Sequence, residues 1–201
     1  MPFTVSILLF PDVELLDAAG PYEVFSTLNL LNSDEQVVVT TFARNKGPVK
    51  TANGMTIYAD ESFDHLKVAD LLILPGGTGT RSLCADADFI KHFKKWCSES
   101  KVVLSVCTGA RVLAKAGLLD GLTATTHHSA IDELRKIAPI TTVVDDKRFI
   151  DNGKFVIAAG VSSGIDASLY IIKQQFGANT AQEIARYIEW KSEHDFSTSP
   201  C

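Results

Sequence analysis

Short, almost wholly apolar runs alternate along this chain with segments in which apolar residues recur every three or four positions. Apolar runs are typical of strands covered on both faces, and the longer spacing is typical of helices packed on one face. Strands are expected at residues 5–10, 37–43, 71–74, 101–106, 123–126, 140–145 and 154–159. Helices are expected at 21–31, 87–98 and 109–119, from 129, from 164 to 176, and from 180 to 191.

Turn and cap residues refine several of these ends. Asn53-Gly54 predicts the turn of a hairpin over residues 48–59. Pro21 suits the first turn of its helix, and Gly177 suits the end of the helix that precedes it. Two pairs fit capping boxes that open helices: Ser129 with Asp132, and Thr180 with Glu183.

The alternation of strands and helices predicts one α/β domain spanning residues 1–201, with its core at about 3–191 and a short C-terminal tail. The sheet is expected to be mostly parallel, with right-handed crossovers and helices on both faces. Ligands of such sheets bind beyond the carboxyl ends of the strands. The segments after Phe10, Leu74, Val106 and Ala159 are therefore the places to look for chemistry.

Composition narrows the functional class. The 201 residues are 46% hydrophobic and 21% charged, which excludes disorder and a small disulfide scaffold. The net charge is −5 without a Lys/Arg cluster, so no nucleic-acid partner is expected. The N-terminal apolar run has no basic region before it, and no segment approaches the roughly 20 apolar residues of a membrane span. These features predict a cytoplasmic protein without a membrane partner.

The four cysteines are Cys84, Cys97, Cys107 and Cys201. They contain no CxxC pair, so their spacing does not support a metal site, and a reducing compartment disfavours disulfides. Cys84 and Cys97 are interpreted as packing residues, and Cys201 as part of the tail.

Cys107 differs because it follows a predicted strand directly and precedes a predicted helix. A helix N-terminus stabilises a thiolate, and thiols in such settings have pKa values lowered to roughly 3.5–7.5. A sharp strand-to-helix turn also projects the side chain out of the sheet, as in a nucleophile elbow. The alternative is a buried cysteine that acts as a small apolar residue.

Two other strand ends carry candidate groups. The glycines of Gly76-Gly77-Thr78-Gly79 offer backbone N–H groups for an oxyanion hole, or they serve a tight turn that needs positive φ. Asp17 lies among apolar neighbours, where burial would raise its pKa and suit it to general acid catalysis. Its alternative is a turn or N-cap role near Gly20.

Two further patterns carry less weight. The segment 160–164 fits G-x-S-x-G around Ser162, but the only histidine after it is His194, so a serine hydrolase is disfavoured. His127 and His128 are adjacent, which is not a zinc-ligand spacing. Two interpretations of one of them stay open, a pocket residue or a surface residue.

Four segments together resemble the ThiJ/PfpI superfamily, over about residues 3–190: LLFPDVELLDAAGPYEVF, LLILPGGTGT, SVCTGARVLAKAGLLDGLTATTHH and AAGVSSGIDASLYI. The pairing of an aspartate in LD-x-x-GP with a cysteine in SVCTG is most similar to the isonitrile hydratase branch. The resemblance implies a flavodoxin-like three-layer sandwich, a homodimer, and no cofactor or metal. It also implies Cys107 as nucleophile and Asp17 as its acid/base partner.

The implied reaction adds water to an isocyanide and gives an N-substituted formamide through a thioimidate on Cys107. Asp17 would supply the proton, the backbone N–H groups of Gly77 and Thr108 would stabilise charge, and His127 would line the pocket. Ser162 and Ser163 depart from the Gly/Ala-rich turn of the branch and would make the pocket more polar.

Two alternatives remain open for the same residues. One is a glyoxalase- or deglycase-like enzyme that acts on reactive aldehydes, using Cys107 with His127. The other is a non-catalytic redox or ligand sensor built on the same thiol.

Overall fold

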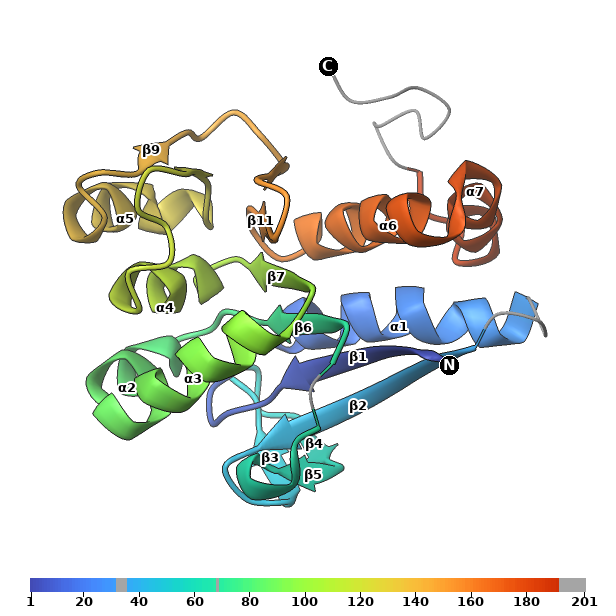
Figure 1. The fold of residues 1–201 in the computed structure, drawn as a ribbon, viewed down its shortest axis with the longest axis horizontal. Helices are drawn as coiled ribbons and strands as arrows, with labels where there is room; N and C mark the ends of the chain where they lie inside the picture. Colours follow the sequence, from blue (N-terminus) through green and yellow to red (C-terminus); the bar gives the residue numbers. More distant parts are fainter. Residues whose placement is uncertain (32–35, 68, 192–201) are drawn as a thin grey trace.

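A seven-stranded sheet forms the centre of the computed structural model, which describes residues 1–31, 36–67 and 69–191 (Figure 1). The strand order is β10-β11-β7-β6-β1-β2-β5, and β10 alone is antiparallel to its neighbour. The strands are β1 (Phe3–Leu8), β2 (Val37–Ala43), β5 (Glu61–Ser62), β6 (Leu71–Leu74), β7 (Val102–Val106), β10 (Phe149–Asp151) and β11 (Phe155–Ala158). The central order β2-β1-β6-β7-β11 is that of a flavodoxin-like doubly wound sheet, as expected.

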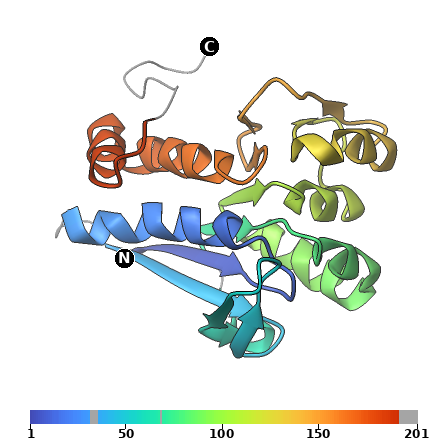
Figure 2. The same cartoon turned by 180° about the vertical axis from the view of Figure 1, so that it is seen from behind.

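Helices cover both faces of this sheet. They are α1 (Leu15–Leu31), α2 (Thr80–Ala85), α3 (Ala87–Glu99), α4 (Gly109–Lys115), α5 (Ile131–Ile137), α6 (Ser163–Phe176) and α7 (Ala178–Tyr187), with 3₁₀ turns η1 (Phe63–His65) and η2 (His128–Ala130). Phe3 packs on Phe176 of α6, whereas Phe42 packs on Trp96 of α3. The register Phe3↔Val37 puts Phe3 and Phe42 on opposite faces, because side chains alternate along a strand. Figures 1 and 2 both show α1 and α6 side by side on one of these faces.

Two small sheets lie outside the central one. The predicted hairpin is confirmed as β3 (Gly47–Lys50) and β4 (Thr56–Ala59), and its turn residue Gly54 has φ +87°. Strands β8 (Thr123–Ala124) and β9 (Thr142–Val143) pair in parallel, so the segments expected at 123–126 and 140–145 form only this short ladder. Strand β10 and helix α2 were not expected. The predicted tail with Cys201 lies outside the described residues.

The placement of Pro21 in the first turn of a helix is wrong, because α1 begins at Leu15 and holds Pro21 in its interior. Packing against α6 offsets the lost helical hydrogen bond. Gly20 allows that packing, since a Cβ there would lie 2.9 Å from Ile165 Cγ1. The longer helix has a functional consequence, because it places Asp17 in the first turn of α1.

Both expected capping boxes are wrong. The N-cap of α5 is Ala130, and the Ser129 N–H instead donates to His127 Nδ1 at 3.3 Å. The Thr180 hydroxyl donates to the Phe176 carbonyl at 2.9 Å, because α7 starts immediately after Gly177. Gly177 itself ends α6 as expected, with φ +92°. Among the described residues, no helix is both long and apolar enough to span a membrane.

Candidate active site

Three loops meet where β1, β6 and β7 end, and they bring Asp17, the Gly76-Gly77 segment and Cys107 together. The Gly76 N–H donates to Asp17 Oδ2 at 2.9 Å. The Gly77 N–H donates to Thr108 Oγ1, also at 2.9 Å, and Thr108 directly follows Cys107. The structure therefore brings these candidate residues together at the strand ends.

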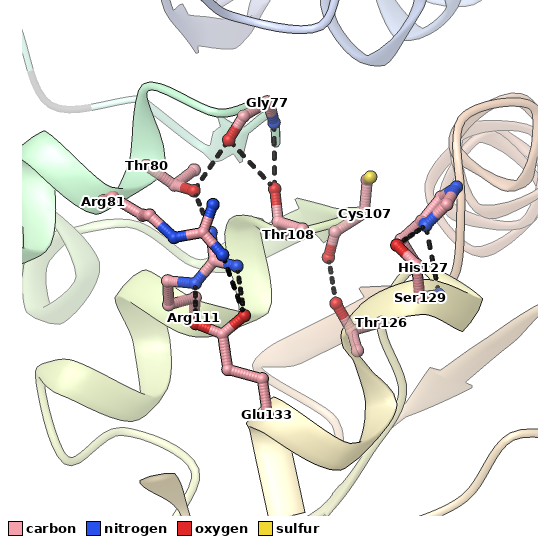
Figure 3. A network of polar contacts seen from close by, with 10 residues as sticks. All are labelled: Gly77, Thr80, Arg81, Cys107, Thr108, Arg111, Thr126, His127, Ser129 and Glu133. Carbon is pink, nitrogen blue, oxygen red and sulfur yellow. Dashed lines mark hydrogen bonds and ion pairs between the residues drawn. The ribbon is translucent and has the colours of Figure 1, made fainter.

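Cys107 occupies a strained turn between β7 and α4. Its φ is +56°, a left-handed conformation that costs a non-glycine residue about 1–2 kcal/mol. Hydrogen bonds on both sides hold this turn: the Cys107 N–H donates to the Ala159 carbonyl at 2.7 Å and to the Ala158 carbonyl at 3.2 Å, and Thr126 Oγ1 donates to the Cys107 carbonyl at 2.8 Å. In Figure 3 the sulfur points away from these anchors, into the space between Gly77 and His127. The turn thus has the form of a nucleophile elbow.

The carboxyl group of Asp17 is buried, with no exposed area. Burial raises its pKa to about 7, against the opposing effect of the Gly76 N–H, and the nearby Glu14 raises it further. Within the described part of the chain, Asp17 Oδ1 accepts no hydrogen bond of standard geometry. Because Oδ2 accepts from Gly76 rather than from a neighbouring N–H, the side chain does not act as a local turn cap or N-cap, and its raised pKa suits proton transfer near neutral pH.

The pKa of the Cys107 thiol is shifted in the opposite direction from that expected. Burial, followed by the Asp17 charge, raises its pKa to about 12, while the N–H groups of Thr108 and Val161 lower it. The prediction of a lowered thiol pKa is wrong, because the side chain is only 6% exposed and faces a carboxylate, and α4 is short. Because the two groups interact, their titrations are coupled, and the carboxyl group loses its proton at a lower pH than the thiol does.

In this arrangement Asp17 is the group that can accept the proton of the Cys107 thiol. After the pair has lost one proton, two forms are possible: a carboxylate with a thiol, or a carboxylic acid with a thiolate. The second form contains the reactive sulfur, and an acid next to it is ready to return the proton. Proton transfer from Cys107 to an ionised Asp17 can therefore supply the thiolate without a histidine.

The two proposed backbone donors differ in the structure. The Gly77 N–H is already donated to Thr108 Oγ1, and the Thr108 hydroxyl donates back to the Gly77 carbonyl at 3.2 Å. The Thr108 N–H, in contrast, faces the Cys107 sulfur, and so does the N–H of Val161. Val161 is the donor that sequence reasoning missed, and Gly77 holds Thr108 instead.

His127 lies on the other side of the sulfur in Figure 3. Its Nδ1 is 2.8 Å from Ser129 Oγ, and burial lowers its pKa, so the ring stays neutral at pH 7. A Cβ on Gly160 would lie 2.7 Å from His127 Cδ2, which shows how closely the ring packs on this loop. The His128 ring packs beside it at a tilt of 39°, with ring centroids 4.2 Å apart.

A pocket of about 330 Å³ lies on the His127 side of the site. It is lined by residues 126–128, 145–148 and 159–161 with Ile131 and Ser163. Ser163 therefore contributes to the pocket wall, whereas Ser162 accepts a hydrogen bond from Arg148 Nη2 at 3.2 Å. Arg148 is in turn held by Asp166 at 2.5 Å. The pocket has a mixed polar and apolar surface, and His127, Gly160 and Val161 form the part of its wall nearest the elbow.

The other cysteines do not share this setting. Cys84 and Cys97 are free thiols, and burial raises the pKa of both, that of Cys97 to about 12. Neither has a carboxylate partner comparable to Asp17. The interpretation of both as packing residues therefore agrees with their surroundings.

Sequence reasoning also missed a buried arginine near the elbow. Arg111 lies in α4 within an otherwise apolar stretch, and it is 8% exposed. Its guanidinium binds Glu133 of α5 and Thr80 of α2, and Thr80 reaches Gly77 (Figure 3). A charged residue on the inward side of a predicted helix was the available indication.

Comparison with known proteins agrees with this geometry. The model of the DJ-1/PfpI family matches residues 3–174. An isonitrile hydratase of Pseudomonas putida is 32% identical over 94% of this chain and 79% of its own length. A deglycase of Pyrococcus abyssi is 30% identical over 83% of this chain and 91% of its own length. A ThiJ/PfpI family protein from Pseudomonas syringae has the same fold, with a TM-score of 0.85 at 24% identity over 96% of this chain and 77% of that one. The chain therefore belongs to the DJ-1/PfpI family.

Proposed function

We propose that this protein is an isonitrile hydratase-like lyase that converts an isocyanide and water into an N-substituted formamide. One observation carries the proposal: a buried carboxyl group with a pKa of about 7 lies beside a cysteine in a strained elbow. The similarity to the Pseudomonas putida isonitrile hydratase supports the same assignment.

The first step forms a bond between the Cys107 sulfur and the isocyanide carbon. Asp17 takes the thiol proton as the sulfur attacks, and the electron pair left on the isocyanide carbon accepts that proton from Asp17. The product is a thioimidate in which the carbon carries hydrogen, the sulfur and a double bond to nitrogen. Asp17 ends the step as a carboxylate, ready for water.

The second step uses water. Asp17 removes one proton from it as the oxygen adds to the same carbon, and passes that proton to the nitrogen, which becomes N–H while Asp17 returns to the carboxylate. The carbon–sulfur bond then breaks, the hydroxyl proton returns through Asp17 to the sulfur, and the formamide leaves. The sum is one isocyanide and one water consumed for one formamide, with no cofactor or metal in any step.

The groups around the sulfur have separate parts in this proposal. The N–H groups of Thr108 and Val161 stabilise negative charge on the sulfur before attack and after expulsion. Neutral His127 forms one wall of the pocket that receives the isocyanide substituent. Gly77 acts through Thr108 rather than as an oxyanion donor.

Incubation of the purified protein with an aryl isocyanide tests the proposal directly. Chromatography should detect the matching formamide, and Cys107→Ala and Asp17→Asn should each lose the activity. Absence of turnover across aryl and alkyl isocyanides would refute the hydratase assignment. In that case the similarity to a deglycase directs the next assay to methylglyoxal, with lactate as the measured product.

We also propose that the protein is a homodimer, as the family resemblance implies. Light scattering after gel filtration should give a mass twice the chain mass of 21.8 kDa. A mass equal to one chain would contradict this.

A further inference from the structure

Arg111 is a permanently charged side chain that the proposed reaction does not use. Its guanidinium is almost fully enclosed between α2, α4 and α5. Nε donates to Glu133 Oε1 at 2.9 Å and Nη2 donates to Glu133 Oε2 at 2.6 Å, which is a bidentate ion pair. The remaining nitrogen, Nη1, donates to Thr80 Oγ1 at 2.5 Å.

An ion pair is an unusual choice for packing one helix against another. Removing charges from water is costly, and well-packed apolar side chains serve the same purpose as well or better. A pair with a buried guanidinium and a partly exposed carboxylate is instead able to fix one particular geometry, because the planar guanidinium fork aligns all its partners at once. The role of Arg111 is therefore sought in the groups that it holds in place.

The partner Thr80 leads straight to the candidate active site. Thr80 is fully buried, and its hydroxyl donates to the Gly77 carbonyl at 2.7 Å. The same carbonyl also receives the Thr108 hydroxyl at 3.2 Å. One residue earlier, the Gly76 N–H donates to Asp17 Oδ2 at 2.9 Å. The Gly76-Gly77 segment thus joins Arg111 to both halves of the Asp17–Cys107 pair.

We propose that Arg111 is a positioning residue: through Thr80 it fixes the Gly76-Gly77 segment, which in turn sets the places of Asp17 and Thr108 relative to the Cys107 sulfur. Glu133 orients the guanidinium for this purpose. This role rests on the proposed function of the Asp17–Cys107 pair, but the alkylation test below does not require turnover.

The test measures how fast iodoacetamide alkylates Cys107 between pH 5 and pH 9, with mass spectrometry of the Cys107 peptide and of the Cys97 peptide as internal control. In the native protein the rate should rise through a first inflection near pH 7, as the Asp17–Cys107 pair loses its first proton. The groups that face Asp17 are the Gly76 N–H, which lowers this inflection, Glu14, and the Cys107 thiol.

Thr80→Val and Thr80→Ser form the matched pair of variants. Valine keeps the shape but loses the hydroxyl, so the Gly76 N–H should bind Asp17 less well and the inflection should move up by about 0.5 pH units or more. Serine retains the hydroxyl and should keep the native inflection. A role in stability alone would lower the unfolding temperature and leave the inflection in place, so equal inflections in the two variants would overturn the proposal.

Arg111→Lys provides a second, independent variant that preserves the charge. A lysine ammonium lacks the planar fork, so it cannot pair with Glu133 in a bidentate manner and also hold Thr80. It should show the same upward movement of the inflection, and it decides the matter if Thr80→Val does not fold. Arg135→Lys, at an exposed ion pair on α5, is the control and should be unchanged.

Turnover of an aryl isocyanide gives a second readout if the protein is a hydratase. Thr80→Val should lower kcat about tenfold and change KM less than about twofold, because Thr80 does not line the pocket. A native alkylation profile in Thr80→Val and Arg111→Lys would disprove the positioning role alone. Absence of turnover in the native protein would disprove the hydratase assignment alone.

Discussion

Replacement of Asp17 by asparagine should stabilise the fold at neutral and alkaline pH while it removes activity. The pKa of Asp17 rises from 3.8 to about 7 on folding, so the folded protein binds this proton more tightly than the unfolded chain does. The resulting penalty is absent below pH 4, grows as the pH rises, and is complete above pH 7. About three pKa units correspond to about 4 kcal/mol at pH 8, and the same relation gives about 1.5 kcal/mol at pH 5.

Urea unfolding of the native protein and of Asp17→Asn measures this difference. Any packing change caused by the amide is the same at every pH, so the informative quantity is the change in their stability difference from pH 5 to pH 8. We expect the asparagine variant to gain about 2.5 kcal/mol over this interval. Asp120→Asn, at an exposed carboxylate, is the control. A stability difference that does not vary with pH would refute the assignment of a raised pKa to Asp17.

Three further substitutions test particular contacts. Cys107→Gly should be about 1 kcal/mol more stable than Cys107→Ala in urea unfolding, because glycine adopts φ +56° without strain; equal stability would contradict the strained elbow. Gly79→Ala should cost about 3 kcal/mol or more in the same assay, since its Cβ would lie 1.9 Å from the Pro11 carbonyl oxygen, and an unchanged midpoint would contradict that close approach. Gly160→Ala should displace the His127 ring and raise KM for the isocyanide with little effect on the free energy of unfolding; an unchanged KM would remove His127 from the pocket wall.

The sheet and the location of the site were predictable from the sequence because both depend on local patterns. Apolar runs such as 71–74 are typical of strands buried in a parallel sheet. In the sequence, polar residues or glycines follow soon after the end of each run. The rule that ligands bind beyond the carboxyl ends of strands then placed Asp17, Gly76 and Cys107 at one edge. The hairpin around Gly54 was likewise set by two adjacent residues.

The electrostatics of the site were not predictable in the same way. A lowered pKa for Cys107 follows from its position before a helix, but its burial and the charge of Asp17, 90 positions earlier in the chain, reverse the direction. The Gly77 N–H looked free in the sequence, yet it is taken by a hydroxyl from another strand end. Such partners are fixed by tertiary packing, and no local pattern reports them.

The predictions of helix ends were wrong for a similar reason. Pro21 is tolerated within α1 because Gly20 lets that helix pack closely on α6, a contact between residues far apart in sequence. Ser129 and Thr180 satisfy the capping pattern, but each finds another partner, His127 Nδ1 or the Phe176 carbonyl. A local capping pattern does not form where another hydrogen-bonding partner lies closer to the same side chain or N–H group.

The covalent intermediate on Cys107 provides the most direct test of the central claim. The native protein would be mixed with an aryl isocyanide, quenched with acid after milliseconds to seconds, and examined by intact-protein and peptide mass spectrometry. We expect an adduct on the Cys107 peptide that adds the mass of one isocyanide, forms before the formamide, and decays as the formamide accumulates. Formamide production with no such adduct, or undiminished production by Cys107→Ala, would contradict it.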